Sequence, residues 1–273
     1  MNQQQQAQAR AKIEGMKAQF EQKRAIATAL GQIKQKVGVY SGKGGVGKTT
    51  VAVNLAVTLA AEGAKVGLLD GDIDCPNVVR ALNISELPLV AEDKRMVPPE
   101  RFDVKVMSMG FFQENEDEAI IWRGPMVHNA INQFLQSTDW GELDYLIIDL
   151  PPGTSDAPLT IMQALDMDGF VVVTTPQQLA MIDAKRSINM IRKLHVNVLG
   201  VVENFSGEIF GTGGGEQLAQ EMDLNFLGRL EMRTDYRDTS KPTVLNSNTV
   251  LNEFQSIVDG MKAGLEAVEV EAD

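Results

Sequence analysis

The sequence has one cysteine, fewer basic than acidic residues, and no long apolar run. The single cysteine, Cys75, excludes an internal disulfide and any mononuclear site that takes several thiolates from one chain. The formal net charge of −12 argues against broad nucleic-acid binding and against binding to anionic membranes. No apolar run reaches the roughly 20 residues of a membrane span. The N-terminus is polar and glutamine-rich, so we expect a cytoplasmic protein without a signal peptide.

A glycine-rich stretch, GKGGVGKT at residues 42–49, is the feature around which the chain is organised. It fits the phosphate-binding pattern G-x-x-x-x-G-K-[ST], with a strand-like run before it and a helix-like run after it. Glycines let backbone amides curl around phosphate oxygens, and a helix N-terminus adds positive partial charge. Lys48 is placed to reach the β- and γ-phosphates, and the Thr49 hydroxyl to bind Mg²⁺. The residues expected to hold the nucleotide in this loop are Gly42, Lys43, Gly44, Gly45, Val46, Gly47, Lys48, Thr49 and Thr50.

Strand-like and helix-like runs alternate along the rest of the chain. The expected strands are residues 37–41, 65–70, 104–109, 145–149, 170–174, 198–204 and 226–230. The expected helices are residues 49–62, 126–136, 157–165, 179–194, 215–222 and 250–267. This alternation predicts an α/β fold, a doubly wound and mostly parallel sheet with helices on both faces. Its ligand belongs at the C-terminal ends of the strands.

Acidic residues end two of the expected strands. Asp70 and Asp72 share one face of a strand end, because side chains alternate along a strand. A carboxylate there can orient an attacking water or hold Mg²⁺ through water, although two acids at a strand end also make an ordinary turn. Residues 145–149, YLIID, match the Walker B pattern, in which Asp149 holds Mg²⁺ through water. The turn that follows, LPPGT at residues 150–154, is suited to sense the γ-phosphate.

The second lysine of the glycine-rich loop makes GKGGVGKT resemble the deviant phosphate loop of the ParA/MinD class of ATPases. The resemblance implies that Lys43 reaches the phosphates of a partner subunit in an ATP-dependent homodimer. It also implies that Asp72 positions the attacking water. Lys43, Lys48 and Asp72 are therefore the expected catalytic residues, and Thr49, Asp70 and Asp149 the expected Mg²⁺ site.

Within that class, the chain resembles the Mrp/ApbC-type iron–sulfur cluster carrier ATPases. The stretches that carry this resemblance include WRGPM at 122–126, WGELDY at 140–145, DLPPGT at 149–154 and GGGE at 213–216. The match runs over about residues 37–258. It implies that Asn204 hydrogen-bonds the adenine edge and that a loop at residues 228–232 lies beside the base. It also implies iron–sulfur assembly or client proteins as partners.

The sequence departs from this family at one place. The family usually carries a C-x-x-C pair between residues 204 and 213, and two such pairs in a dimer would hold one [4Fe–4S] cluster. Here that stretch is FSGEIFGT at residues 205–212, with no cysteine. A cluster usually takes four thiolates, and a homodimer of this chain offers two. Cys75 is read as a small residue of the switch region, with a redox-sensitive thiol or a cluster ligand as alternatives.

Residues 1–36 precede the ATPase domain, which we expect over residues 37–267, with an acidic tail at 268–273. Apolar residues recur in the first segment at helical spacing, among glutamines and charged residues. They are Ile13, Met16, Phe20, Ala27, Leu30 and Ile33. We expect this amphipathic helix to pack on its own domain, the alternative being a helix that binds a partner or a second copy.

Four functions compete at this point. The first is a Mg²⁺-dependent, ATP-hydrolysing homodimer that works in iron–sulfur cluster assembly. The second is a spatial switch of the MinD or ParA kind, against which the acidic C-terminal tail argues, because a membrane-targeting helix is basic. The third is a reductase like the nitrogenase iron protein, against which the missing thiolates argue. The fourth is a nucleotide-dependent adaptor that carries no cluster.

Overall fold

The computed structural model describes residues 15–17, 20–21, 24–112 and 124–272 of the 273 residues. Its centre is an eight-stranded sheet in the order β10-β9-β8-β1-β7-β2-β6-β5. The strands are β1 Ile33–Tyr40, β2 Val66–Asp70, β5 Glu100–Arg101, β6 Val104–Ser108, β7 Leu143–Asp149, β8 Gly169–Thr174, β9 Val198–Ser206 and β10 Phe226–Glu231. Every ladder of this described sheet is parallel except the one between β5 and β6. The prediction of a doubly wound, mostly parallel sheet is confirmed.

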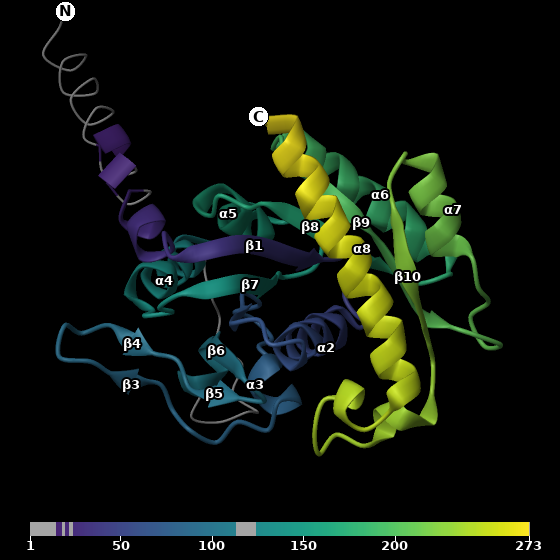
Figure 1. The fold of residues 1–273 in the computed structure, drawn as a ribbon. Helices are drawn as coiled ribbons and strands as arrows, with labels where there is room; N and C mark the ends of the chain where they lie inside the picture. The colour runs from purple at the N-terminus through teal and green to yellow at the C-terminus, as the bar shows by residue number, and fades with distance from the viewer. Residues whose placement is uncertain (1–14, 18–19, 22–23, 113–123, 273) are drawn as a thin grey trace, which may run out of the picture.

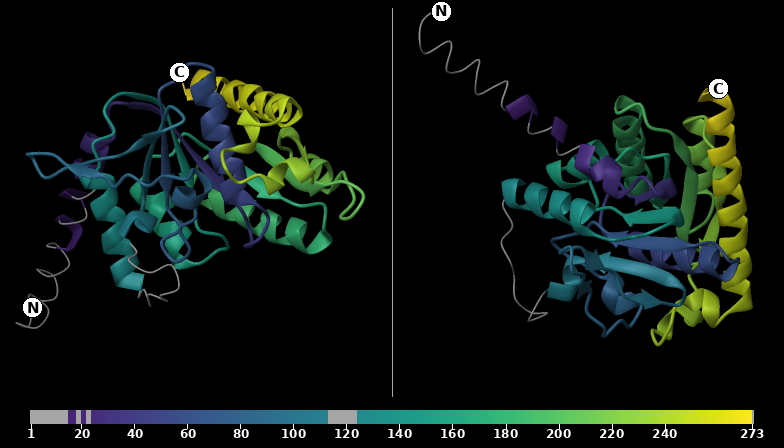
Figure 2. Two further views of the ribbon diagram at one scale, coloured as in Figure 1. Left: turned by 90° about the horizontal axis from the view of Figure 1, so that it is seen from below. Right: turned by 60° about the vertical axis from the view of Figure 1, so that its left-hand side comes forward.

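Helices lie on both faces of the sheet, as Figures 1 and 2 show. The helices are α2 Lys48–Ala61, α3 Val78–Ala81, α4 Gly124–Ser137, α5 Asp156–Ala164, α6 Gln178–Lys193, α7 Gly214–Glu221 and α8 Asn248–Ala272. Three short 3₁₀ turns are η1 Met109–Phe112, η2 Thr234–Arg237 and η3 Thr243–Leu245. α2 and α8 pack against each other over one face, while α4 packs on α5 and α6 packs on β8 over the other. The central strands are therefore covered on both sides, which explains their near-continuous Val, Ile and Leu content.

The C-terminal ends of β1, β2 and β7 meet at one edge of the sheet. Asp149 at the end of β7 is the register partner of Val39 in β1 and of Asp70 in β2. β1 has β7 on one side and β8 on the other. From β1 the chain continues to β2, on the β7 side, whereas from β7 it crosses to β8, so the winding direction reverses here. This is the point in a doubly wound sheet where a ligand crevice forms.

Several boundaries differ from those expected. β1 begins at Ile33, four residues before the expected start, because Ile33 is already buried against the core. Residues 228–231 belong to strand β10 and do not form the expected loop, since they pair with β9. α8 continues to Ala272, so the acidic residues after 267 extend this helix. The described residues contain no helix with the length and apolar character needed to cross a bilayer.

A two-stranded ribbon outside the main sheet was not expected. It pairs β3 Leu89–Val90 with β4 Met96–Val97 in antiparallel register. The ribbon is tied to the end of α4, because the Asp139 amide donates to the Met96 carbonyl at 2.8 Å and Arg95 pairs with Asp139 at 2.9 Å. It extends beside α4 at the margin of the molecule (Figure 1).

Candidate functional site

The glycine-rich loop joins β1 to α2 and is closely packed from outside. Gly47 has a φ of +80° at the start of α2, and a Cβ there would lie 2.2 Å from Nδ2 of Asn204. A Cβ on Gly42 would lie 2.2 Å from the backbone carbonyl of Asp183 in α6. No side chain among the described residues caps α2, so the first amides of this helix stay available to phosphate oxygens. The loop therefore has the shape and the donors of a phosphate cradle.

The two loop residues expected to act on the nucleotide converge on one carboxylate. The buried Lys48 ammonium forms an ion pair with Oδ1 of Asp149. The Thr49 hydroxyl donates to Oδ2 of the same carboxylate at 2.6 Å. A hydroxyl and a carboxylate are hard oxygen ligands of the kind that Mg²⁺ takes. The structure therefore brings Lys48, Thr49 and Asp149 together, as their positions in the sequence predicted.

Asp70 lies in the same cluster but is already engaged by its own chain. Its Oδ2 accepts hydrogen bonds from the Ser108 hydroxyl at 2.9 Å and from the Val78 amide at 3.1 Å. Burial, with the nearby charge of Asp149, raises the pKa of Asp70 to about 7. Asp70 thus anchors the loop that follows β2, and its role as a Mg²⁺ ligand stays a prediction.

Asp72 and Lys43 are both half-buried. Oδ1 of Asp72 accepts a hydrogen bond from the Cys75 amide at 3.2 Å, and the side chain is half-buried. Burial raises the pKa of Asp72, although the positive charge of Lys48 acts against it. The half-buried Lys43 forms no ion pair with any described residue. Its ammonium is therefore free to bind a phosphate, whereas that of Lys48 is paired.

Tyr40 links the phosphate loop to the turn after β7, a contact that the sequence did not reveal. Its hydroxyl donates to the carbonyl of Gly153, and the Gly153 amide donates to the Ser41 carbonyl at 3.0 Å. Burial raises the pKa of Tyr40 to about 12, so its hydroxyl keeps its proton and stays a donor. The turn at residues 150–154 is thereby held against the strand that leads into the phosphate loop.

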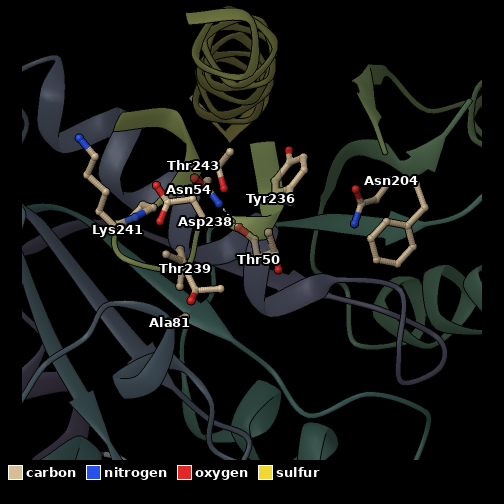
Figure 3. A pocket seen from close by; sticks show the side chains of 12 residues that line it. Thr50, Asn54, Ala81, Asn204, Tyr236, Asp238, Thr239, Lys241 and Thr243 are labelled. Carbon is tan, nitrogen blue, oxygen red and sulfur yellow. Dashed lines mark hydrogen bonds between the residues drawn. The ribbon is translucent and has the colours of Figure 1, made fainter. Parts of the chain in front are cut away.

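A pocket lies beside the phosphate loop, at the end of β9 (Figure 3). Asn204 lines it and donates from Nδ2 to the Val46 carbonyl at 2.9 Å. Thr50 and Asn54 of α2 form another wall, and Asn54 accepts from the Val244 amide at 3.0 Å. The remaining lining residues are Val53, Ala81, Phe205, Tyr236, Asp238, Thr239, Lys241, Pro242 and Thr243.

The pocket is lined by residues between 236 and 243, which follow β10, and by none of residues 228–232, the segment expected beside the base. Asn204 lines the pocket, with one amide hydrogen used for the phosphate loop. Its hydrogen bond to a base stays a prediction.

The short segment between β9 and α7 is closed at its base by the buried Glu203. Oε1 accepts from the Ser206 hydroxyl at 2.6 Å and from the Gly213 amide at 3.0 Å, and Oε2 from the Gly215 amide at 2.6 Å. Arg229 donates to Oε1 at 2.8 Å. Burial raises the pKa of Glu203, but these hydrogen bonds together outweigh it and leave the pKa lowered. Glu203 is thus an ionised clamp, which sequence reasoning had not singled out.

The tip beyond this clamp is a tight hairpin. Gly207 and Gly211 exchange two backbone hydrogen bonds, of 3.0 and 2.8 Å. The tip exposes Ile209 and, less fully, Phe210, and it contains no cysteine. Cys75 is exposed in the loop after β2, and the described residues hold no group of three or more His, Cys, Asp or Glu arranged for a metal ion.

The sequence matches a known family over most of its length. Residues 32–262 match ParA, described as the NUBPL iron-transfer P-loop NTPase. The chain belongs to this family. An iron–sulfur cluster carrier protein of Methanococcus maripaludis is 41% identical over 259 residues, 89% of this chain and 90% of the relative. The iron–sulfur cluster transfer protein NUBPL of Dictyostelium discoideum is 44% identical over 78% of this chain and 69% of its own length.

Two solved structures share this fold, and one of them holds a nucleotide. A nucleotide-binding protein of Archaeoglobus fulgidus in complex with ADP has a TM-score of 0.71 and 35% identity, covering 81% of this chain and 91% of its own. The cell-division ATPase MinD of Pyrococcus furiosus has a TM-score of 0.65 at 20% identity, covering 84% of this chain and 98% of its own, which shows the shared fold. This member of the NUBPL family is therefore a P-loop ATPase.

Proposed function

We propose that the chain is a Mg²⁺-dependent ATPase whose nucleotide state controls a homodimer working in iron–sulfur cluster assembly. The observation that carries the ATPase part is the convergence of Lys48 and Thr49 on Asp149 beneath a glycine cradle. ATP would lie with its phosphates in the cradle and its base in the pocket beside Asn204. Mg²⁺ would be held by Thr49, with Asp70 and Asp149, and would neutralise phosphate charge.

In this proposal the protein residues bind and orient the reactants. Lys48 would leave Asp149 for the β- and γ-phosphates, because a phosphate offers more negative charge than one carboxylate. Asp72 would orient the attacking water toward the γ-phosphate from the loop after β2. The loop amides and the N-terminus of α2 would stabilise the charge that develops on the phosphate oxygens.

Dimerisation is supported by the free ammonium of Lys43 at the edge of the phosphate loop. In the proposed homodimer, Lys43 would bind the phosphates of the partner subunit's nucleotide. We expect Lys43→Ala to keep ATP affinity within about threefold but to lose ATP-dependent dimerisation and at least ~10² of turnover. Lys48→Ala should lose ATP binding itself. Light scattering with and without ATP measures dimerisation, and nucleotide titration measures ATP affinity. An equal loss of ATP affinity in both variants would contradict the role of Lys43 at the partner subunit's nucleotide.

The cargo part of the proposal is supported by the names of the relatives, which are cluster carriers. Cys75, exposed beside Asp72, is the thiolate that each protomer could bring to a cluster. Anaerobic reconstitution with iron and sulfide, counting both per dimer in wild type and Cys75→Ser, tests this. A cluster lost in the variant supports carriage through Cys75, and a cluster retained in it points to other ligands.

A second candidate is a nucleotide-dependent adaptor that carries no cluster. The cysteine-free hairpin beyond Glu203 favours it, because the segment offers no thiolate for a metal. In that case reconstitution would leave neither iron nor sulfide on the protein, while ATP hydrolysis remained intact. The partners would then be assembly or client proteins, in the cytoplasm, with residues 37–267 acting as the ATPase domain and residues 1–36 as an extension.

A further inference from the structure

Two apolar surfaces of this chain are not covered by any of its described residues. We propose that the N-terminal helix of one copy docks into a methionine-rich groove on a second copy, in a reciprocal contact that needs no nucleotide. The N-terminal helix comprises residues 15–17, 20–21 and 24–29. The methionine-rich groove is lined by Met96, Met109, Phe112, Met126 and Phe134. None of these residues belongs to the phosphate loop, and the contact does not depend on the proposed function.

The N-terminal helix leaves the domain with its apolar face bare. Ile26 and Leu30 are buried and anchor its last turn in the core. About two to three turns earlier, Met16 and Phe20 are 62% and 71% exposed, and their spacing of four residues puts them on the same helix face. The described parts of this helix project beyond the sheet in both Figures 1 and 2. Two large apolar side chains in such a place indicate a surface that is covered by another body.

The groove is a hollow of about 480 Å³ between α4, η1 and the β3–β4 ribbon. Its wall includes the rings of Phe112 and Phe134, whose centres are 5.9 Å apart. Phe112 is 50% and Met126 49% exposed. Flexible thioether side chains adapt to an inserted helix, which is why methionine-rich grooves bind amphipathic helices. Val90 is the register partner of the groove residue Met96, so this exposed ribbon residue continues the same apolar surface.

Charge favours this occupant. Residues 1–24 contain five basic and two acidic residues in a chain whose net charge is −12, so the remainder is more acidic than the whole. Lys17, Glu21 and Arg24 are exposed on the N-terminal helix, while Glu86 and the turn residues Glu92, Asp93, Lys94 and Arg95 are exposed along the ribbon. The complementarity is therefore one of net charge, between the basic segment 1–24 and the acidic remainder of the chain.

The arrangement of the elements favours a second copy over the chain's own helix. α4 lies between the N-terminal helix and the β3–β4 ribbon (Figure 1). Docking within one chain would require the helix to reverse over α4 while Ile26 and Leu30 stay buried. A two-fold exchange needs no reversal and makes the contact twice, which brings its area toward the roughly 1,200–2,000 Å² of stable interfaces.

Cysteine cross-linking tests the contact directly, because Cys75→Ser leaves a cysteine-free background. Phe20→Cys and Met126→Cys are each made in that background, and the two full-length proteins are mixed without nucleotide and mildly oxidised. We expect a disulfide-linked heterodimer of about twice 29.8 kDa. The matched control mixes Met126→Cys with Val270→Cys, which is equally exposed on α8. Cross-linking of the control to the same extent would show random collision and overturn the proposal.

Solution mass gives an independent measure. We expect Phe20→Ser to weaken the nucleotide-free dimer at least about tenfold, with ATP hydrolysis per monomer unchanged, whereas Val270→Ser leaves the dimer intact. A monomeric wild type, or a Phe20→Cys/Met126→Cys double variant that links only within one chain, would overturn the second-copy assignment. So would sedimentation of wild type, but not Phe20→Ser, with phosphatidylserine vesicles, which would make the helix a membrane anchor.

Discussion

Asp149 binds the side chains of Lys48 and Thr49, the two phosphate-loop residues expected to act on the nucleotide. Asp70 and Asp72 lie nearby. Three carboxylates near one lysine differ in their environments. Asp149 is paired with Lys48, Asp70 is hydrogen-bonded to Ser108 and Val78, and Asp72 is half-buried with one weak backbone contact. Asp72 therefore has the greatest freedom to meet a water molecule, which makes it the residue of choice for orienting the nucleophile.

Replacing Asp72 by Asn should separate binding from turnover. The amide keeps the size and the hydrogen bond to the Cys75 amide but removes the charge that orients water. We expect MgATP affinity within about threefold of wild type and turnover lower by about 10²–10³. Single-turnover hydrolysis beside nucleotide titration measures both, and Asp74→Asn, exposed two residues on, is the control. Turnover that stays within a factor of three would remove Asp72 from the mechanism.

At the scale of elements, Tyr40 of β1 contacts the turn after β7, residues 150–154, which is expected to sense the γ-phosphate. This contact couples that turn to the phosphate loop. Tyr40→Phe removes the donor to the Gly153 carbonyl and leaves that carbonyl without its partner, at a cost of about 1–3 kcal/mol. We expect faster amide hydrogen exchange at residues 153–155 and slower ATP turnover, with ADP affinity little changed. Tyr145→Phe, on the neighbouring β7, is the control. Unchanged exchange at the turn would show that Tyr40 is only a packing residue.

The hairpin between β9 and α7 depends on one buried charge. Glu203→Gln removes the ionic partner of Arg229 and places an amide NH₂ opposite at least one of the four donors, so we expect the free energy of unfolding to fall by about 3 kcal/mol. Glu216→Gln, an exposed carboxylate that also pairs with Arg229 at 3.3 Å, should cost less than about 1 kcal/mol. Chemical denaturation measures both. Equal effects in the two variants would mean that the clamp contributes no more than a surface ion pair.

At the scale of the whole molecule, stability should depend on pH through Asp70. Its pKa in the folded state is raised to about 7, above the roughly 3.9 of an unfolded chain. The folded state therefore binds the extra proton, so this contribution is full below about pH 4 and is lost as the pH rises through 7. Asp70→Asn should be more stable relative to wild type at pH 8 than at pH 5, by on the order of 1–3 kcal/mol.

This comparison is made by denaturation in EDTA without nucleotide, so that neither ligand masks the titration. Taking the difference between variant and wild type removes the contribution of carboxylates whose pKa is lowered, such as Glu203, because both proteins contain them. A difference that is the same at both pH values would contradict the raised pKa of Asp70.

The parts of the fold that the sequence predicted are those with a local signal. The strand, glycine loop and helix around Lys48 follow one another within a few residues, and Asp149 ends a run of apolar residues that can only be a buried strand. The two-residue strands β3, β4 and β5 are too short to show a period. Tyr40 and Gly153 are 113 residues apart, and the donors to Glu203 come from two strands and a helix start. Contacts of that kind have no sequence pattern of their own.

The loop that the resemblance implied at residues 228–232 is wrong for a similar reason, because residues 228–231 lie in β10. Gly228 has a φ of +156° in this strand interior, where Ile257 of α8 leaves only 3.0 Å for a Cβ. The chain instead turns after β10, and Asn54 of α2 fixes residues 242–245 by its hydrogen bond to Val244. The family match shows the fold and the ATPase activity. The contacts of residues 236–243 show that this segment lines the pocket.

The Glu203 clamp separates the hairpin tip from the rest of the fold. One carboxylate fixes both ends of the segment, and Gly207 and Gly211 close it again by their mutual hydrogen bonds. The residues between these two glycines therefore do not support the nucleotide site. Insertions or cysteines could enter or leave at the tip across a lineage, or in a designed graft, without refolding the ATPase. Cargo chemistry and nucleotide chemistry can then diverge independently in one scaffold.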